Sequence, residues 1–151
     1  MATKHQKIRV KIGEGFDADV RQEIAEDLID VMIARSETGK GVYGPAGKKR
    51  KRKFPAYTDA YTKKKGQSHV DLILRDEMLE SMELLSDGPT TLTIGFRNGS
   101  KENAKADGNI RGTYGKQRAS SKKARPFLGL TKTELNEVLK RHRSDLTDDE
   151  E

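Results

Sequence analysis

The sequence predicts a small α+β domain, because strand and helix patterns both occur but do not alternate regularly along the chain. Residues 7–12 alternate between basic and apolar side chains, which indicates a half-buried strand with Ile8, Val10 and Ile12 facing inward. Residues 17–35 carry apolar side chains every three or four positions, which indicates an amphipathic helix. A length of 151 residues suits one domain. We therefore expect a small mixed or antiparallel sheet packed by two main helices, with long basic loops.

The first helix is predicted to begin at Asp17 or Asp19, either of which can cap its N-terminus. Its inward face carries a regular set of apolar side chains: Val20, Ile24, Leu28, Val31 and Met32. Its outward face is acidic: Glu23, Glu26, Asp27 and Asp30.

The periodicity stops after this helix, and we expect a long basic loop over about 36–69. Residues 39–66 hold ten Lys or Arg and one Asp, a net charge of 10 − 1 = +9. Glycine and proline are frequent there, and a short helix over 57–65 is the one regular alternative. Loops of more than about 15 residues in a small domain tend to be functional or disordered.

Regular patterns resume in the second half of the chain. We expect a strand over 70–74, a short helix over 75–83, a turn over 87–89, a strand over 90–96 and a short helix over 101–106. The inward side chains of these elements are Met78, Leu79, Met82, Leu92, Ile94 and Phe96.

A final helix is predicted to open at Thr131, because Thr131 and Glu134 have the spacing of a capping box. It carries Leu135, Val138, Leu139 and His142 on one side. The expected domain spans 1–144, and residues 145–151 read as a solvated acidic tail.

The amino-acid composition excludes several classes of function. Charged residues make up 36% and apolar residues 32%, and the net charge is 30 − 24 = +6, a balance that favours polyanions or acidic protein surfaces as partners. The absence of Cys excludes disulfides, thiolate zinc sites and cysteine nucleophiles. No apolar stretch approaches the ~18 residues of a membrane span, and residues 1–10 lack the apolar core of a signal peptide. We expect no membrane association.

Neither the glycine-rich segment after the first helix nor the three histidines support a catalytic function. Gly39, Gly41 and Gly44 match the glycine spacing of a dinucleotide fingerprint, but they follow a helix and run into Pro45, whereas that fingerprint must join a strand to a helix. The three histidines, His5, His69 and His142, have no second ligand at metal-binding spacing. We expect a protein that is not an enzyme and that holds no cofactor and no metal.

The strongest electrostatic signal is a run of six cations: Lys48, Lys49, Arg50, Lys51, Arg52 and Lys53. It suits contact with nucleic-acid phosphates, assisted by Tyr57 and Tyr61, or with an acidic protein partner. A nuclear-import signal is a second interpretation. A solvated loop, or one docked on the acidic face of the first helix, is the third.

Four segments together resemble the tail-completion (virion morphogenesis) proteins of tailed bacteriophages. They are Leu74-Arg-Asp-Glu-Met-Leu-Glu-Ser-Met82, Leu92-Thr-Ile-Gly-Phe96, Asn103-Ala-Lys-Ala-Asp-Gly-Asn109 and Ala124-Arg-Pro-Phe-Leu-Gly-Leu-Thr131. Their order is the same as in that family, and the resemblance covers roughly residues 54–142. The most specific part is the motif formed by Arg125, Pro126, Phe127, Leu128 and Gly129.

The resemblance implies a structural virion protein with an α+β core and long loops that order on assembly. Such a protein forms a homo-oligomeric ring, six- or twelve-fold, at the neck or upper tail. It is assembled in the host cytoplasm and joins the tail to the head. Its implied partners are neck or connector proteins, a tail terminator and, through the basic loop, genomic double-stranded DNA. The alternative function is that of a small basic nucleic-acid-binding module.

Overall fold

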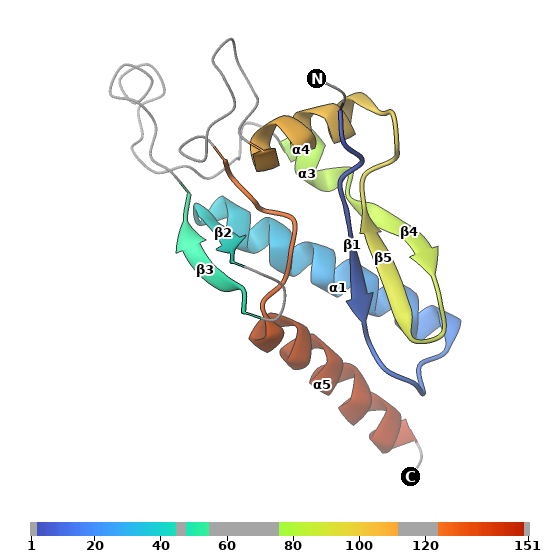
Figure 1. Ribbon diagram of the computed structural model, residues 1–151. Helices are drawn as coiled ribbons and strands as arrows, with labels where there is room; N and C mark the ends of the chain where they lie inside the picture. Colours follow the sequence, from blue (N-terminus) through green and yellow to red (C-terminus); the bar gives the residue numbers. More distant parts are fainter. Residues whose placement is uncertain (1–2, 45–47, 55–75, 112–123, 150–151) are drawn as a thin grey trace.

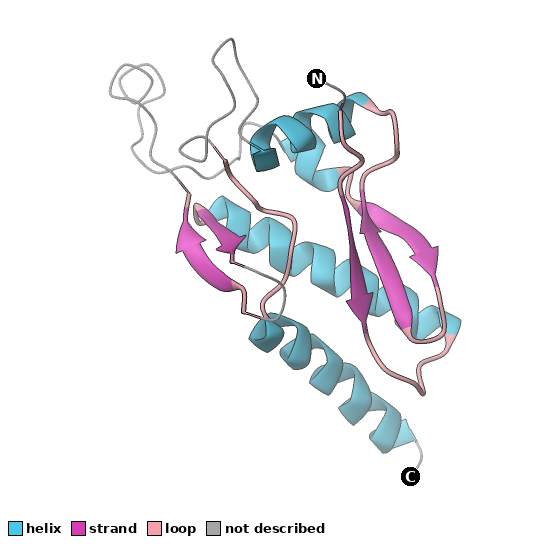
Figure 2. Ribbon diagram, viewed as in Figure 1, coloured by secondary structure: helices cyan, strands magenta, loops and turns pink. Residues whose placement is uncertain are grey.

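The computed structural model describes residues 3–44, 48–54, 76–111 and 124–149 (Figure 1). Within these ranges the chain forms two small antiparallel sheets and four helices, so the α+β prediction is confirmed (Figure 2). None of the described helices is long and apolar enough to cross a membrane.

The larger sheet has three antiparallel strands in the order β1 (Lys7–Lys11), β5 (Thr91–Gly95) and β4 (Glu83–Asp87). Val10 lies opposite Leu92, and both are buried, as the alternation of their strands predicted. β4 is a correction, because the sequence predicted a helix up to residue 83 and a turn soon after. The register of β4 shifts between Leu84 and Ser86, and this bulge removes the simple alternation by which a strand is recognised.

The helix α1 (Ala18–Glu37) lies across one face of this sheet (Figure 1). Asp17 caps it, as predicted, because its carboxylate accepts a hydrogen bond from the Val20 amide at 2.9 Å. Ile24, Leu28 and Met32 are fully buried against the sheet. The helix extends two residues beyond the predicted end.

Two shorter helices, α3 (Asp76–Glu80) and α4 (Lys101–Arg111), pack on each other at one end of the larger sheet (Figure 1). Met78, Leu79 and Met82 are buried, as predicted. α3 is shorter than the predicted helix, and α4 is about twice as long as predicted. The strand predicted over 70–74 and the optional helix over 57–65 lie outside the described residues.

The last helix, α5 (Lys132–Asp149), packs along α1. Its predicted capping box is present: the Glu134 amide donates to Thr131 Oγ1 at 3.1 Å, and the Thr131 amide donates to Glu134 Oε1 at 2.8 Å. The helix continues to Asp149, through most of the segment expected to be an acidic tail. No Gly or Pro interrupts residues 132–149, so the backbone has no reason to leave the helix earlier.

The second sheet corrects the first part of the expected long loop. Residues 40–43 form β2 (Lys40–Tyr43) and residues 50–53 form β3 (Arg50–Lys53), paired as an antiparallel hairpin beside the C-terminal end of α1 (Figure 1). Four of the six residues of the basic run are therefore strand residues. Residues 45–47 and 55–69 of the expected loop lie outside the described residues.

Candidate functional site

The basic run forms an exposed edge of the molecule. All four side chains of β3 are exposed, and so is Lys48. Lys49 differs, because it is half-buried and its Nζ lies 3.3 Å from the position that a Cβ would take on Gly129. Five of the six predicted cations thus face solvent, and one covers the 125–129 segment.

The hydrogen bonds of the hairpin determine which backbone groups of β3 face outward. The Phe54 amide donates to the Gly39 carbonyl at 2.8 Å, and in an antiparallel pair the inward-bonding residues alternate. Arg50 and Arg52 therefore direct their backbone groups toward β2, while Lys51 and Lys53 direct theirs away from it. On the opposite edge of β2, the Val42 amide donates to the Pro126 carbonyl at 2.9 Å. Within the described chain, β2 is thus enclosed on both edges and β3 is the outer strand.

An aromatic side chain holds one cation of β3 in place. The guanidinium carbon of Arg52 lies 5.4 Å from the centroid of the Tyr43 ring, within the range of a cation–π contact. The Tyr43 hydroxyl donates to the Ala124 carbonyl at 3.4 Å. Burial raises the pKa of Tyr43 above its usual value, while the positive charges of Arg52 and Arg125 act in the opposite direction.

The predicted motif Arg125–Gly129 lies beside the hairpin and joins it to the core. The Arg125 amide donates to the Asn109 carbonyl at 2.6 Å, and the Pro126 carbonyl accepts from β2. Phe127 is completely buried, and its ring meets the Phe96 ring edge-on at a centroid distance of 6.0 Å. Leu128 is half-buried against the same core. The structure therefore brings the two predicted groups of site residues together, the basic run and the 125–129 motif.

A buried arginine fixes this motif from the other side. Arg35, in the last turn of α1, donates from Nη2 to the carbonyls of Phe127 at 2.6 Å and Gly129 at 2.9 Å. Its Nη1 lies 2.7 Å from Glu134 Oε1, and both side chains are at most 8% exposed. Burial lowers the pKa of the Arg35 guanidinium from its usual value, and the Glu134 carboxylate opposes that shift. One side chain thus connects α1, the 125–129 motif and the first turn of α5.

The glycines that resemble a dinucleotide fingerprint have structural roles here. Gly39 and Gly44 have φ of 80° and 104°, a conformation that favours glycine, and they stand at the two ends of β2. At Gly41 a Cβ would lie 2.5 Å from Phe54 Cε1 and 2.9 Å from the Pro126 carbonyl oxygen. These glycines allow the hairpin to approach the 125–129 motif closely.

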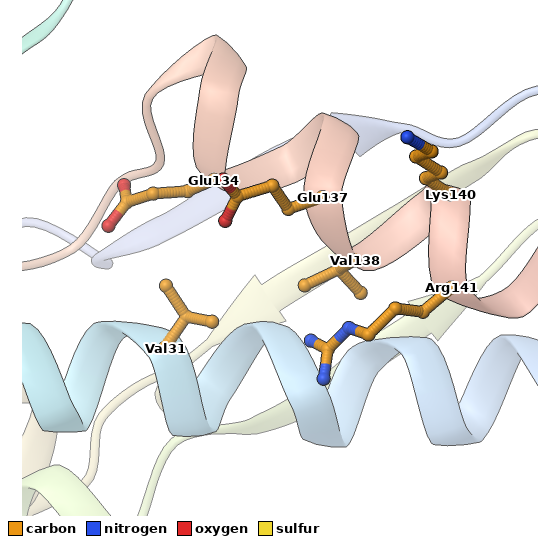
Figure 3. A pocket seen from close by; sticks show the side chains of 6 residues that line it. All are labelled: Val31, Glu134, Glu137, Val138, Lys140 and Arg141. Atoms are coloured by element: carbon orange, nitrogen blue, oxygen red, sulfur yellow. The ribbon is translucent and has the colours of Figure 1, made fainter.

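A groove of about 370 Å³ lies between α1 and α5 (Figure 3). Val31 and Val138 face each other across it, with Glu134, Glu137, Lys140 and Arg141 around them. Its Glu134 already belongs to the buried ion pair with Arg35. Within the described residues there is also no group of three or more His, Asp or Glu side chains that could hold a metal ion.

The histidines take part in packing. His142, on α5, is 8% exposed and its Nε2 lies 2.7 Å from Asp27 Oδ2 of α1. His5 donates from Nε2 to the Phe96 carbonyl at 2.6 Å. His69, Tyr57 and Tyr61 lie outside the described residues.

Sequence reasoning missed Arg35 and Tyr43. Arg35 lies on the same buried face of α1 as Leu28 and Met32. A cation on an apolar helix face indicates that an acidic partner is buried beside it, and the sequence contained this signal. Tyr43 gave no such signal, because its contact with Arg52 depends on the hairpin register.

We compared the chain with protein-family models, with curated protein sequences and with solved structures, and none of the three comparisons gave a match.

Proposed function

We propose that the chain is a structural virion protein of a tailed phage, a ring subunit at the neck or upper tail that joins the tail to the head. Its partners are copies of itself in a six- or twelve-fold ring, the neighbouring connector and tail-terminator proteins, and the DNA that passes through the joint. The proposal begins from the four segments that resemble tail-completion proteins.

One observation carries the proposal furthest: the most specific of these segments supports the most highly charged surface. Val42 bonds to Pro126, Lys49 covers Gly129, and Arg35 holds the carbonyls of Phe127 and Gly129. The basic strand β3 is therefore presented on a backbone tied to the core. A joining protein needs such a fixed, charged surface, because its task is to hold other chains in one geometry.

The proposal is tested by in vitro joining of heads and tails. Heads and tails are made separately by a phage lacking this protein, and infectious particles are counted after purified protein is added. We expect infectivity to depend on the added protein, and we expect antibody labelling to locate the protein at the joint. Full infectivity without the protein would refute the proposed function.

A variant with Gln at all six positions 48–53 refines this test. This variant removes six positive charges. Because five of the six side chains are exposed, we expect near-normal stability but poor joining of heads to tails. A control for the location of the charge replaces three exposed cations of β1, Lys7, Arg9 and Lys11, by Gln. Equal joining by wild type and the six-Gln variant would leave the basic run without a role.

A small nucleic-acid-binding module is the second candidate, and the hairpin itself favours it. A two-stranded ribbon can enter the DNA major groove, and here it carries exposed cations and a guanidinium stacked on Tyr43. This candidate predicts a monomer or dimer whose DNA affinity falls steeply with salt. Such binding by a protein that is never found in particles would favour it over the ring subunit.

A further inference from the structure

A second charged surface runs along α1. Four carboxylates, which we call the acidic stripe, are exposed on this helix: Asp19, Glu23, Glu26 and Asp30. Their spacings of four, three and four residues place them on one face, since a helix turns about 100° per residue. The exposed residues on the two sides of the stripe are Gln22 and Ala34, which are uncharged. This face of α1 therefore carries no cation.

The acidic stripe is not neutralised within the described chain. None of its four carboxylates takes part in an ion pair there, and Glu26 has only a long hydrogen bond of 3.5 Å from Gln22. Like charges three or four residues apart on a helix repel and destabilise the helix. The stripe therefore gains from a positively charged neighbour.

The basic strand β3 of the same chain is in the wrong place to be that neighbour. The chain leaves α1 after Glu37 and turns back into the hairpin, so β2 packs beside the C-terminal end of the helix and β3 pairs with β2 (Figure 1). Glu37, two turns after Asp30 and on the same face, is the exposed acid of α1 nearest the hairpin, and Asp30 lies about 10 Å of helix before it. Exposed charges separated by more than about 10 Å are largely screened at 0.1 M salt. Asp19, Glu23 and Glu26 lie still further from the end of the helix beside which the hairpin sits.

We propose that β3 of one copy binds the acidic stripe of a second copy. The two surfaces match in spacing: cations on one face of β3, such as Arg50 and Arg52, are about 7 Å apart along the strand, and carboxylates four residues apart on the stripe, such as Asp19 and Glu23, are about 6 Å apart along the helix. They also match in charge, because the exposed cations of β3, two on each face of the hairpin, are opposite in sign to the exposed carboxylates of the stripe.

The charges of β3 also argue against a contact between two β3 strands. Lys and Arg on an outer strand oppose edge-to-edge pairing with an identical strand, because like charges would lie opposite each other. A contact that joins different surfaces of the two copies avoids this repulsion. Such a head-to-tail contact closes into a ring when its rotation permits and otherwise forms a filament. The closure of this contact into a ring rests on the proposed function. The contact itself follows from the charges and positions of the two surfaces.

The test uses three charge-reversal variants of the full chain. The strand variant carries Arg50→Glu, Lys51→Glu and Lys53→Glu, and it retains Arg52 because that side chain packs on Tyr43. The helix variant carries Glu23→Lys, Glu26→Lys and Asp30→Lys. The control carries Lys7→Glu, Arg9→Glu and Lys11→Glu, which changes the net charge as much as the strand variant does but alters another exposed basic strand. Thermal melting checks that each variant is folded.

Association is measured by sedimentation velocity on nuclease-treated protein at low and at high salt. We expect wild type and the control to associate at low salt and to dissociate as salt rises. We expect the strand variant and the helix variant each to lose association by on the order of a hundredfold, since attractions become repulsions. An equimolar mixture of these two variants should associate again, because each supplies the surface that the other needs.

Several results would overturn the inference. They are a wild type that stays monomeric at low salt, a helix variant that associates normally, or a mixture of variants that stays dissociated. Loss of DNA binding in the strand variant without any change in association would assign β3 to nucleic acid instead. Head–tail joining separates this inference from the proposed function: normal joining by the helix variant refutes only the contact between copies, whereas absence of wild-type protein from the joint refutes the proposed function.

Discussion

Replacing Arg35 by Met is expected to destabilise the fold by about 3–5 kcal/mol, because removing one partner of a buried ion pair leaves the other charge uncompensated. The guanidinium contacts Glu134 at 2.7 Å and the carbonyls of Phe127 and Gly129 at 2.6 and 2.9 Å. Met retains an unbranched apolar side chain but donates no hydrogen bond. Glu134 would still accept from the Thr131 amide at 2.8 Å, so the helix cap limits the loss.

Urea unfolding measures this change through the midpoint and the slope of the transition. With a slope of about 2 kcal/mol per M, the midpoint of Arg35→Met should fall by about 1.5–2.5 M. Arg21→Met is the matched control, because Arg21 lies on the same helix but pairs with Asp87 nearer the surface, at side-chain exposures of 17% and 32%. Arg21 also donates to the Phe16 carbonyl at 2.7 Å, so we expect that control to lose about 1–2 kcal/mol. Equal midpoints for the two variants would refute the assigned role of Arg35.

Three further outcomes are expected. Phe127→Ala should cost about 3–5 kcal/mol, because the side chain is fully buried, and an unchanged melting temperature would contradict that burial. Gly41→Ala should cost about 1–3 kcal/mol, because its Cβ would clash with Phe54 and Pro126, and urea unfolding measures the loss. The difference in ultraviolet titration between wild type and Tyr43→Phe should have a midpoint above pH 10; since the folded state holds this proton more tightly, the stability that Tyr43 contributes should fall as pH rises past about 10.

The elements that the sequence predicted are those in which local periodicity and core packing agree. β1 and β5 alternate because one face of each is buried in the hydrophobic core, and α1 repeats every three or four residues because one side of it is buried in the same core. Thr131 and Glu134 identified the start of α5, because a capping box is a local interaction. β4 escaped detection, since its bulge places two half-buried leucines, Leu84 and Leu85, in succession.

The hairpin could not be predicted for a different reason: its stability comes from residues far away in the chain. Val42 bonds to Pro126, and the Gly41 backbone lies against Phe54 and Pro126. A window of sequence around residue 40 contains none of this information. The lysines and arginines of β3 have exposed side chains, so they show no apolar alternation even though their backbone is paired.

The fold also determines how the six cations of the basic run are presented to a partner. In the sequence, Lys48–Lys53 form one run of six cations. In the structure, pairing of β3 with β2 distributes the strand's cations over the two faces of the hairpin. Lys51 and Lys53 lie on one face of the hairpin and Arg50 and Arg52 on the other, because side chains alternate along a strand. Arg52 is further held by Tyr43, and Lys49 is turned toward Gly129. A flexible run would adapt to any polyanion, whereas a paired strand presents its cations at fixed spacing, and fixed spacing favours a partner whose acids are equally fixed. The acidic stripe of α1 has that property, which supports the proposed contact between β3 and a second copy of this chain.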